Sequence, residues 1–180
     1  MKNLFLGLII ALSPLSTACS QTQPTQAVSV GKAPKTVKTQ LNAVLATYYG
    51  VKDALVATNS QKAQTEAGKL MATLAKVEVA TLTDEQQKFY APLAEKLRAD
   101  AQYISETTDV EKQRTRFEGV SNNLYVVITT FKANTATAYQ QYCPMAFDDK
   151  GAFWLSDKKE VRNPYFGNKM LKCGSVKAEF

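Results

Sequence analysis

Residues 37–55 read VKTQLNAVLATYYGVKDAL, and their pattern sets the class of fold. Apolar side chains recur at alternating steps of three and four residues, which places them on one face of an α-helix. These positions are Val37, Leu41, Val44, Tyr48, Val51 and Leu55. The stretch therefore predicts an amphipathic helix that buries this face.

Three further segments repeat the same spacing along the chain. Their apolar positions are Ala63, Ala67, Leu70, Leu74 and Val77, then Phe89, Leu93, Leu97, Ala101 and Ile104, then Val110, Phe117, Val120, Leu124, Val127 and Phe131. Pro92 falls inside the third segment, and proline removes a backbone hydrogen bond and crowds the preceding turn. We therefore expect the third helix either to kink at Pro92 or to start later than its cap indicates.

Residues suited to helix N-caps stand before each of these segments. Asn59 precedes the second, while Thr83 and Gln86 have the spacing of a capping box before the third. Thr108 and Glu111 repeat that spacing before the fourth. The caps divide the periodic region into four helices joined by short connections.

Four such helices predict an all-α domain built as an antiparallel four-helix bundle. The aromatic residues Tyr48, Tyr49, Tyr90, Tyr103 and Phe117 fall at helical spacing. We interpret them as packing in the core or at its edge, not as a ligand site.

The helical period is lost after about Tyr139, where glycine, proline and aromatic residues become frequent. Such composition is typical of loops and short turns. We expect residues 142–180 to be an irregular aromatic- and glycine-rich segment packed on the bundle, containing at most a short hairpin.

The amino terminus has the order of a secretion signal. Lys2 gives a positive start, residues 4–12 form an uncharged apolar run, and small residues follow up to Ala18. The apolar run is shorter than the roughly 20 residues that a membrane-spanning helix needs. Residues 1–18 are therefore predicted to be a signal peptide, which implies export from the cytoplasm.

Cys19 follows Ser16-Thr17-Ala18 directly, which resembles the lipobox of bacterial lipoproteins. In that family the cysteine carries the lipid, and a leucine is preferred where Ser16 stands here. The resemblance implies a periplasmic protein that is lipid-anchored to the membrane through Cys19. Cleavage after Ala18 without lipidation, which would secrete the protein into the periplasm, is the alternative.

The residues after Cys19 are rich in serine, glutamine, threonine, proline and alanine. A segment so poor in large apolar side chains buries too little surface to offset the entropy of ordering it. We interpret residues 19–35 as the lipid-attachment cysteine with a flexible tether. Residues 36–180 are then one domain, large enough for its own core.

The chain contains no histidine, which excludes catalytic triads with an imidazole base and zinc sites built on histidine. Its three cysteines are too few for a four-cysteine zinc site. Nothing specific indicates an enzyme, although paired carboxylates or a lysine would still permit one. The 22 basic and 16 acidic residues are intermixed, without the basic stripe typical of nucleic-acid binding.

Two thiols and two thioethers stand in mirror order in the tail, as Cys143 and Met145 near its start and Met170 and Cys173 near its end. Soft sulfur ligands favour Cu(I) and Ag(I). This set is the candidate metal site, and the indole of Trp154 is a candidate for cation–π contact with the bound ion.

The alternative is a disulfide between Cys143 and Cys173, since cysteines of exported domains normally pair. Closing a loop of about 30 residues would stabilise the fold by roughly 3 to 4 kcal/mol. The methionines would then only fill gaps in the core. Spacing alone leaves both interpretations open.

Four short motifs carry a resemblance to a known family: YCPMA at 142–146, GAFWLS at 151–156, NPYFG at 163–167 and MLxCG at 170–174. Together they resemble the domain-of-unknown-function family numbered 3347, over roughly residues 36–180. The resemblance implies a helical bundle followed by this tail. Its members occur as exported single domains and fused to periplasmic adaptors of heavy-metal efflux pumps.

This context implies a soft metal as cargo and a pump adaptor as partner. The Cys-Pro-Met triplet at 143–145 is also similar to one in the heavy-metal-binding domains of such pumps, where a histidine usually follows and Ala146 stands here. We expect a non-enzymatic protein that binds Cu(I) or Ag(I) and hands it to an efflux system, with a disulfide-stapled structural or interaction domain as the alternative.

Overall fold

The computed structural model describes residues 30–180. The predicted signal peptide, Cys19 and most of the predicted tether lie outside these residues. In the described part of the tether, Val30 and Ala33 are buried against the core. Gln86 Nε2 also donates to the Val30 carbonyl at 3.2 Å. The stretch just before the first helix therefore packs on the domain.

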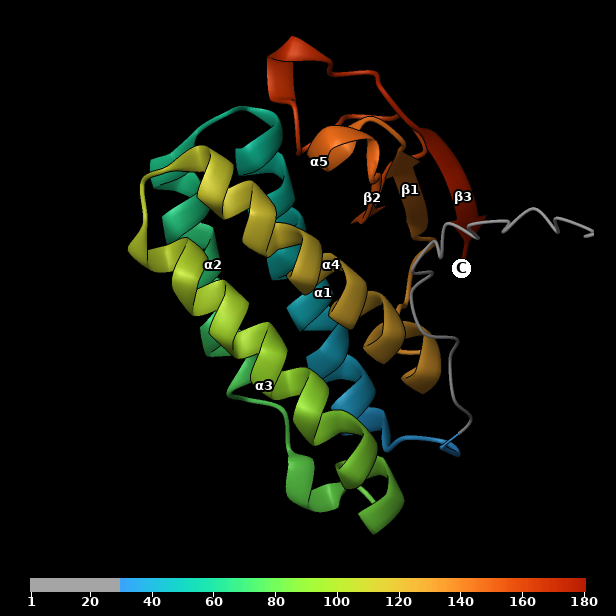
Figure 1. Cartoon of the computed structure of the whole chain (residues 1–180). Helices are drawn as coiled ribbons and strands as arrows, with labels where there is room; N and C mark the ends of the chain where they lie inside the picture. Colours follow the sequence, from blue (N-terminus) through green and yellow to red (C-terminus); the bar gives the residue numbers. More distant parts are fainter. Residues whose placement is uncertain (1–29) are drawn as a thin grey trace, which may run out of the picture.

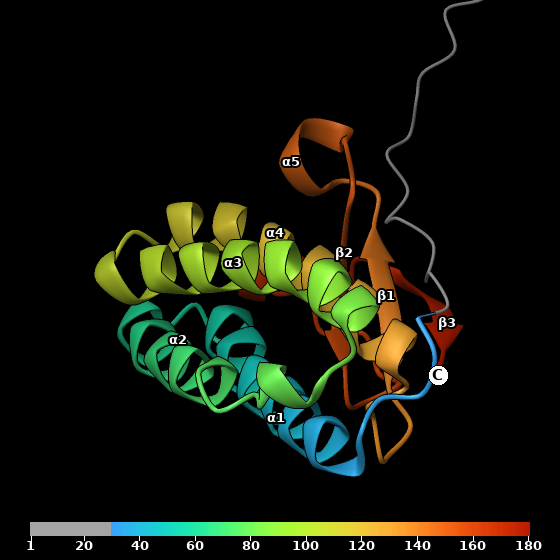
Figure 2. The same cartoon turned by 90° about the horizontal axis from the view of Figure 1, so that it is seen from below.

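The protein is mostly helical. The four long helices are α1 (Lys35–Val56), α2 (Ser60–Leu74), α3 (Asp84–Glu106) and α4 (Val110–Phe131). Each packs against the next along the chain, and α1 also packs against α4. Figure 2 shows α1 and α2 in one layer and α3 and α4 in a second. A short 3₁₀ turn, η1 (Val79–Thr81), precedes α3.

The side chains that the periodicity assigned to the core are largely buried. All six predicted positions of α1 are fully buried, as are Phe117, Val120, Leu124 and Val127 of α4. Val77 is buried too, although α2 ends before it at Leu74. Tyr103 differs, since it is 37% exposed and Arg116 lies 4.7 Å from its ring centroid. The pattern thus identified most of the buried positions, whereas Phe89, Leu93 and Val110 are only partly buried at the edge of the core.

Two of the three predicted caps are present as expected. The Asn59 side chain accepts from the Lys62 amide at 2.9 Å, and Thr83 with Gln86 forms a complete capping box. The Thr108 prediction is wrong, because Asp109 caps α4. Its carboxylate accepts hydrogen bonds from two amides of the first turn. Its negative charge also interacts favourably with the positive end of the helix dipole.

The third helix starts directly after its Thr83 cap and runs through Pro92 without interruption. The expectation of a later start is therefore wrong.

The all-α prediction needs correction in the tail, which contains a three-stranded antiparallel sheet. Its strands are β1 (Tyr139–Cys143), β2 (Ala152–Ser156) and β3 (Ser175–Glu179), in the order β2-β1-β3. Each strand is only five residues long, and β1 (YQQYC) and β2 (AFWLS) do not alternate between polar and apolar residues, so the sequence gives little signal for the sheet. The sheet lies beside α4 and α1, and β2 packs against both (Figure 1).

Buried polar contacts of α1 fix the sheet to the helices. Tyr48 Oη accepts from the Leu155 amide of β2 at 3.0 Å and lies 2.8 Å from Ser121 Oγ of α4. Lys52, which is also buried, pairs with Asp157 at 3.0 Å, just beyond β2. These contacts set where the tail lies on the helices.

No helix within residues 30–180 is both long and apolar enough to cross a membrane.

Candidate functional site

The sheet brings Cys143 and Cys173 together from the two ends of the tail. Cys143 is the last residue of β1, and Cys173 lies two residues before β3. In the antiparallel register Tyr142 pairs with Ser175, so the residue after Tyr142 and the residues just before Ser175 lie close together. The two Sγ atoms lie 2.8 Å apart, and both residues are free thiols. The sequence predicted the pair but not the sheet that forms it.

Gly174 permits this close approach. Its φ is +136°, and a Cβ atom there would lie 2.8 Å from the Tyr142 carbonyl oxygen and 2.9 Å from the Trp154 ring. Any larger residue would push the segment that carries Cys173 away from β1. The glycine is thus a steric requirement of the thiol pair.

Asn163, which is fully buried, holds the segment that carries Cys173. Its side-chain amide donates to the Cys173 carbonyl at 2.9 Å, and its side-chain oxygen accepts from the Tyr165 amide at 2.8 Å. Its backbone amide donates to the Leu171 carbonyl at 2.8 Å. One side chain therefore connects the 163–166 and 171–173 stretches. Sequence reasoning missed this role, for which an asparagine directly before a proline was the only signal.

The two thiols differ in their surroundings. Cys143 is fully buried, while Cys173 is half-buried. The hydrogen bond with Cys143, helped by burial, raises the pKa of Cys173 to about 11. Cys173 is therefore a protonated thiol at neutral pH, and any metal that it binds must displace this proton.

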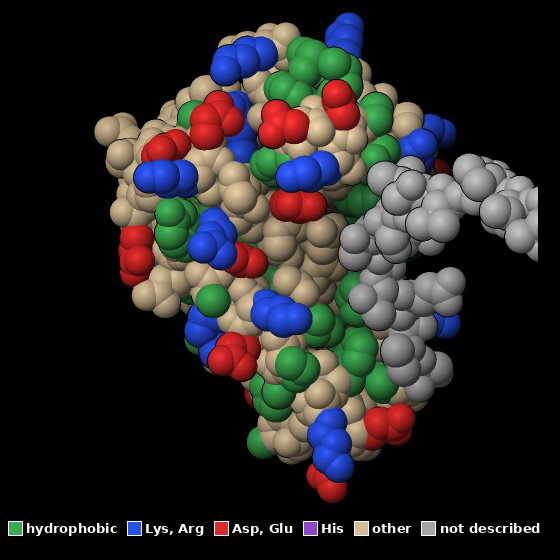
Figure 3. All heavy atoms as spheres, in the orientation of Figure 1, with side chains coloured by type: hydrophobic (Ala, Val, Ile, Leu, Met, Phe, Trp, Pro, Cys, Tyr) green, Lys and Arg blue, Asp and Glu red, His purple; other side chains and the backbone are tan. Residues whose placement is uncertain are grey.

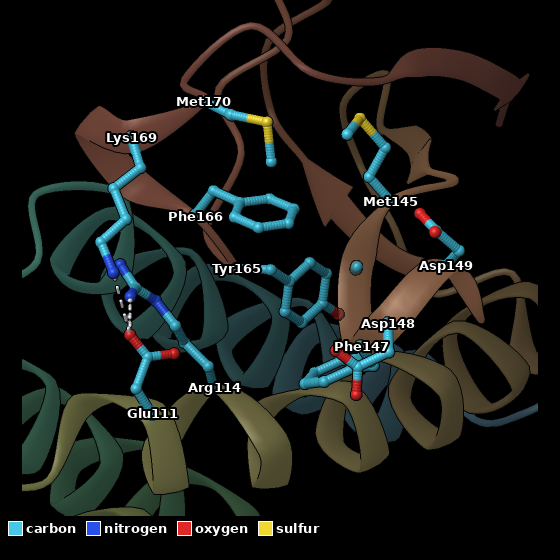
Figure 4. Close-up of a pocket in the computed structure, with 11 residues that line it drawn as sticks. Glu111, Arg114, Met145, Phe147, Asp148, Asp149, Tyr165, Phe166, Lys169 and Met170 are labelled. Atoms are coloured by element: carbon cyan, nitrogen blue, oxygen red, sulfur yellow. Dashed lines mark hydrogen bonds and ion pairs between the residues drawn. The ribbon is translucent and has the colours of Figure 1, made fainter.

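The two methionines line a hollow beside the thiols, with a volume of about 630 Å³. Met145 is 47% exposed and Met170 is half-buried. Figure 4 shows both thioethers at the edge of this hollow above the rings of Tyr165 and Phe166. The thioethers are therefore open to a ligand in the hollow, whereas neither thiol lines it.

One wall of the hollow is α5 (Ala146–Asp149), a single turn directly after the Cys-Pro-Met triplet. Phe147, Asp148 and Asp149 all have positive φ, between 54° and 62°, so the turn is left-handed. Each such non-glycine residue costs roughly 1 to 3 kcal/mol and persists only where its surroundings hold it. Gly151, whose amide donates to the Ala146 carbonyl at 2.9 Å, closes the turn.

Arg114 of α4 forms the opposite wall and is 2% exposed. Its Nη1 donates to Glu111 at 2.8 Å and its Nε to the Pro164 carbonyl at 2.9 Å. The guanidinium thereby connects α4 to the tail beneath the hollow. Sequence reasoning missed Arg114, because its position within the helix gives no sign of a partner 50 residues away.

Hydrophobic side chains reach the surface at this end of the molecule, with acidic side chains beside them (Figure 3).

Comparison with family models gives one match, to "Protein of unknown function (DUF3347)", over residues 44–136. This range is more than half of the chain and runs from α1 to beyond α4. The chain belongs to the DUF3347 family. No curated protein and no solved structure matches the sequence.

The part of this DUF3347 protein that the family model matches is helical, and the thiols lie beyond it. Glu111 and Arg114, on one side of the hollow, belong to the matched range, whereas its other lining residues come from the tail. The tail motifs that suggested the family therefore stand outside the matched range. Family membership thus rests on the helical part of the chain, and the chemistry of the tail depends on the tail's own residues.

Trp154, the candidate for cation–π contact, is fully buried and packs edge-on against Tyr165 at 5.9 Å between ring centroids. It does not line the hollow. Among residues 30–180, no cluster of three or more His, Cys, Asp or Glu side chains is suited to a metal ion. The candidate ligands in the tail of this family member are therefore two thiols and two thioethers.

Proposed function

We propose that this protein binds a soft monovalent metal ion, Cu(I) or Ag(I), through Cys143, Met145, Met170 and Cys173. The observation that carries the proposal is the convergence of two free thiols, 2.8 Å apart, beside a hollow edged by two thioethers. Soft sulfur ligands of this kind select Cu(I) over hard cations. The protein then acts by binding and transfer, not by catalysis.

Metal binding requires a small opening of the thiol pair. A metal–sulfur bond is about 2.3 Å long, so two thiolates on one tetrahedral ion lie roughly 3.8 Å apart. Cys173 is the partner free to move, because it is half-buried and precedes an edge strand. The helices, which we infer to form an antiparallel four-helix bundle, would give the site a rigid support.

The predicted lipid at Cys19 would keep the domain at the membrane on the periplasmic side. A tethered metal carrier can reach a periplasmic adaptor of a heavy-metal efflux pump, which we propose as the recipient. A Cys19→Ser variant should then move from the membrane fraction to the soluble periplasmic fraction. Retention of the variant in the membrane would contradict lipid anchoring.

The metal proposal is tested by competition for Cu(I) against a chromogenic chelator, without oxygen and with reduced protein. Cys143→Ser and Cys173→Ser should each weaken binding by more than about a hundredfold, beyond the loss typical of an outer-shell group. Replacing both Met145 and Met170 with leucine should weaken it roughly tenfold, equivalent to about 1.4 kcal/mol. Met71→Leu, in α2, is the matched control.

An affinity that the cysteine variants leave unchanged would overturn the proposal. An effect of Met71→Leu as large as that of the double methionine variant would remove the thioethers from the site.

A second function is favoured by the same short distance, namely a tail stapled by a Cys143–Cys173 disulfide. Thiols this close need only a small movement to reach the bond length of about 2.05 Å. The tail would then be a structural or interaction element. Alkylation of envelope-isolated protein without prior reduction separates the two, because a disulfide blocks both thiols and the metal proposal requires them to be free.

A further inference from the structure

The hollow carries opposite charges at its two sides. On one side Arg114 and Lys169 share a single carboxylate oxygen of Glu111, at 2.8 and 3.9 Å. On the other, Asp148 and Asp149 have no ion-pair partner within the described residues. Figure 4 shows these groups on opposite sides of the Tyr165 and Phe166 rings. One side thus has excess positive charge and the other excess negative charge.

Arg114 also has an unused donor. A guanidinium has five N–H groups. Nε donates to Pro164, Nη1 once to Glu111, and Nη2 to the Leu55 carbonyl and Thr58 Oγ1. One Nη1 hydrogen therefore lacks an acceptor in the part of the chain that the structure describes. Because this side chain is 98% buried and lines the hollow, the free hydrogen favours an anionic oxygen from a ligand.

The space between the charged sides is apolar. The large apolar and aromatic side chains that line it are those of Met145, Phe147, Tyr165, Phe166 and Met170. Its volume of about 630 Å³ lies within the range of small-molecule sites, and is far more than a metal ion alone would fill. The hollow therefore suits a ligand with an apolar body and two opposite charges.

We propose that the hollow binds a short apolar peptide with free termini. The peptide carboxylate faces Arg114 and Lys169, and its ammonium group faces Asp148 and Asp149. A single amino acid carries both charges on one carbon, whereas two or three residues separate them by roughly 7 to 10 Å. Because the charges of the hollow lie on opposite sides of the Tyr165 and Phe166 rings, they suit the longer ligand, and the apolar walls suit aliphatic or aromatic side chains.

This site is distinct from the proposed metal function, although Met145 and Met170 belong to both. The thiols do not line the hollow. A Cys143→Ser variant should therefore lose Cu(I) binding and keep peptide binding, so either proposal can fail without the other.

Isothermal titration calorimetry with trileucine tests the proposal on the purified reduced protein. Trileucine should bind, and acetylation of its amino terminus or amidation of its carboxyl terminus should each weaken binding roughly tenfold, since each removes one charged contact. Equal affinities for the free and blocked peptides, or no binding of trileucine, would overturn the proposal.

Variants on each side of the hollow test which side binds the amino terminus of the peptide and which binds its carboxyl terminus. The double variant Asp148→Asn and Asp149→Asn should weaken binding of trileucine but not of its N-acetyl form. Lys169→Gln should weaken binding of trileucine but not of its amide. Glu160→Gln and Lys172→Gln, exposed and outside the hollow, are the matched controls. If the controls lower the affinity as much as the test variants, the recognition is not local and the proposed site is wrong.

Discussion

The four helices and the C-terminal tail are stabilised in different ways. Each helix buries one apolar face that recurs every three to four residues, so its contacts follow from local sequence. The tail depends on single long-range contacts, such as Tyr48 to Leu155, Arg114 to Pro164 and Asn163 to Cys173. The free thiols and the left-handed turn lie in this second region, which also lines the hollow everywhere except at Glu111 and Arg114. The four helices thus form a regular support for an irregular site in the tail.

The largest expected effect is at the contact between the two regions. Phe117 stacks on Tyr48 at 5.0 Å and lies 6.0 Å from the Tyr165 ring, between ring centroids. Phe117→Ala should lower the free energy of unfolding by about 3 to 5 kcal/mol, because it leaves a cavity where helices and tail meet. Urea denaturation followed by circular dichroism and by Trp154 fluorescence measures this loss.

The two signals should move together in that variant. If only the fluorescence midpoint shifted, the tail would unfold separately, and Phe117 would not connect the two regions. Tyr103→Ala, at an exposed position of α3, should change the free energy by less than about 0.5 kcal/mol.

Replacing glycine with alanine should lower the stability of the protein in the tail and raise it in the helices. Gly151 has a φ of +77°, and a Cβ atom there would overlap the Tyr142 hydroxyl. Gly151→Ala should therefore destabilise the tail by at least about 1 to 3 kcal/mol. Gly68→Ala, in α2 with no atom within 4 Å of the added Cβ, should stabilise the protein by about 0.5 to 1 kcal/mol. Thermal unfolding of both variants checks the contrast, which equal effects would contradict.

Tyr48→Phe should remove the polar connection between α1 and β2. It leaves the buried Leu155 amide without its acceptor, which costs about 1 to 3 kcal/mol. Chemical denaturation of this variant should show that loss, and Tyr49→Phe should change little. A loss below about 0.5 kcal/mol for Tyr48→Phe would mean that packing alone fixes the sheet to the helices.

The smallest expected effect concerns the ion pair between Lys52 and Asp157. Burial raises the pKa of the Asp157 carboxyl, but the Lys52 ammonium group at 3.0 Å outweighs it and holds that pKa below its ordinary value. The pair therefore stabilises the fold above pH 4, and this contribution is lost as the pH falls through the lowered pKa. Because Asp157 is partly exposed, Asp157→Asn should cost at most about 1 kcal/mol.

Unfolding midpoints of Asp157→Asn and of the unmodified protein between pH 7 and pH 2.5 measure this difference. The two curves should converge at the acid end. A constant difference at every pH would show that the asparagine acts through packing and not through charge.

The same division between regions explains how much the sequence could predict. The period of three to four residues identified all four long helices, and Asn59 and Thr83 were found as caps because capping depends on nearby residues. Asp109 was missed since Thr108 offered a similar signal one residue earlier. These errors are local and small.

The sheet and the hollow could not be predicted in this way. Strand β3 is five residues long, and its pairing with β1 depends on residues more than 30 positions away. Arg114 belongs to α4 by its local sequence, and only the folded tail gives it a partner in Pro164. The sulfur residues were identified by their chemistry, but only the structure shows that the thioethers line the hollow and the thiols do not.

Native mass spectrometry with Cu(I) tests the central claim most directly. The reduced protein, its Cys143→Ser variant and its Cys173→Ser variant are titrated without oxygen, beside a sample kept unreduced. We predict one tightly held ion per chain in the reduced protein and none in either variant. No retained ion, together with an unreduced mass about two units below the thiol form, would contradict the metal site and identify the pair as a structural disulfide.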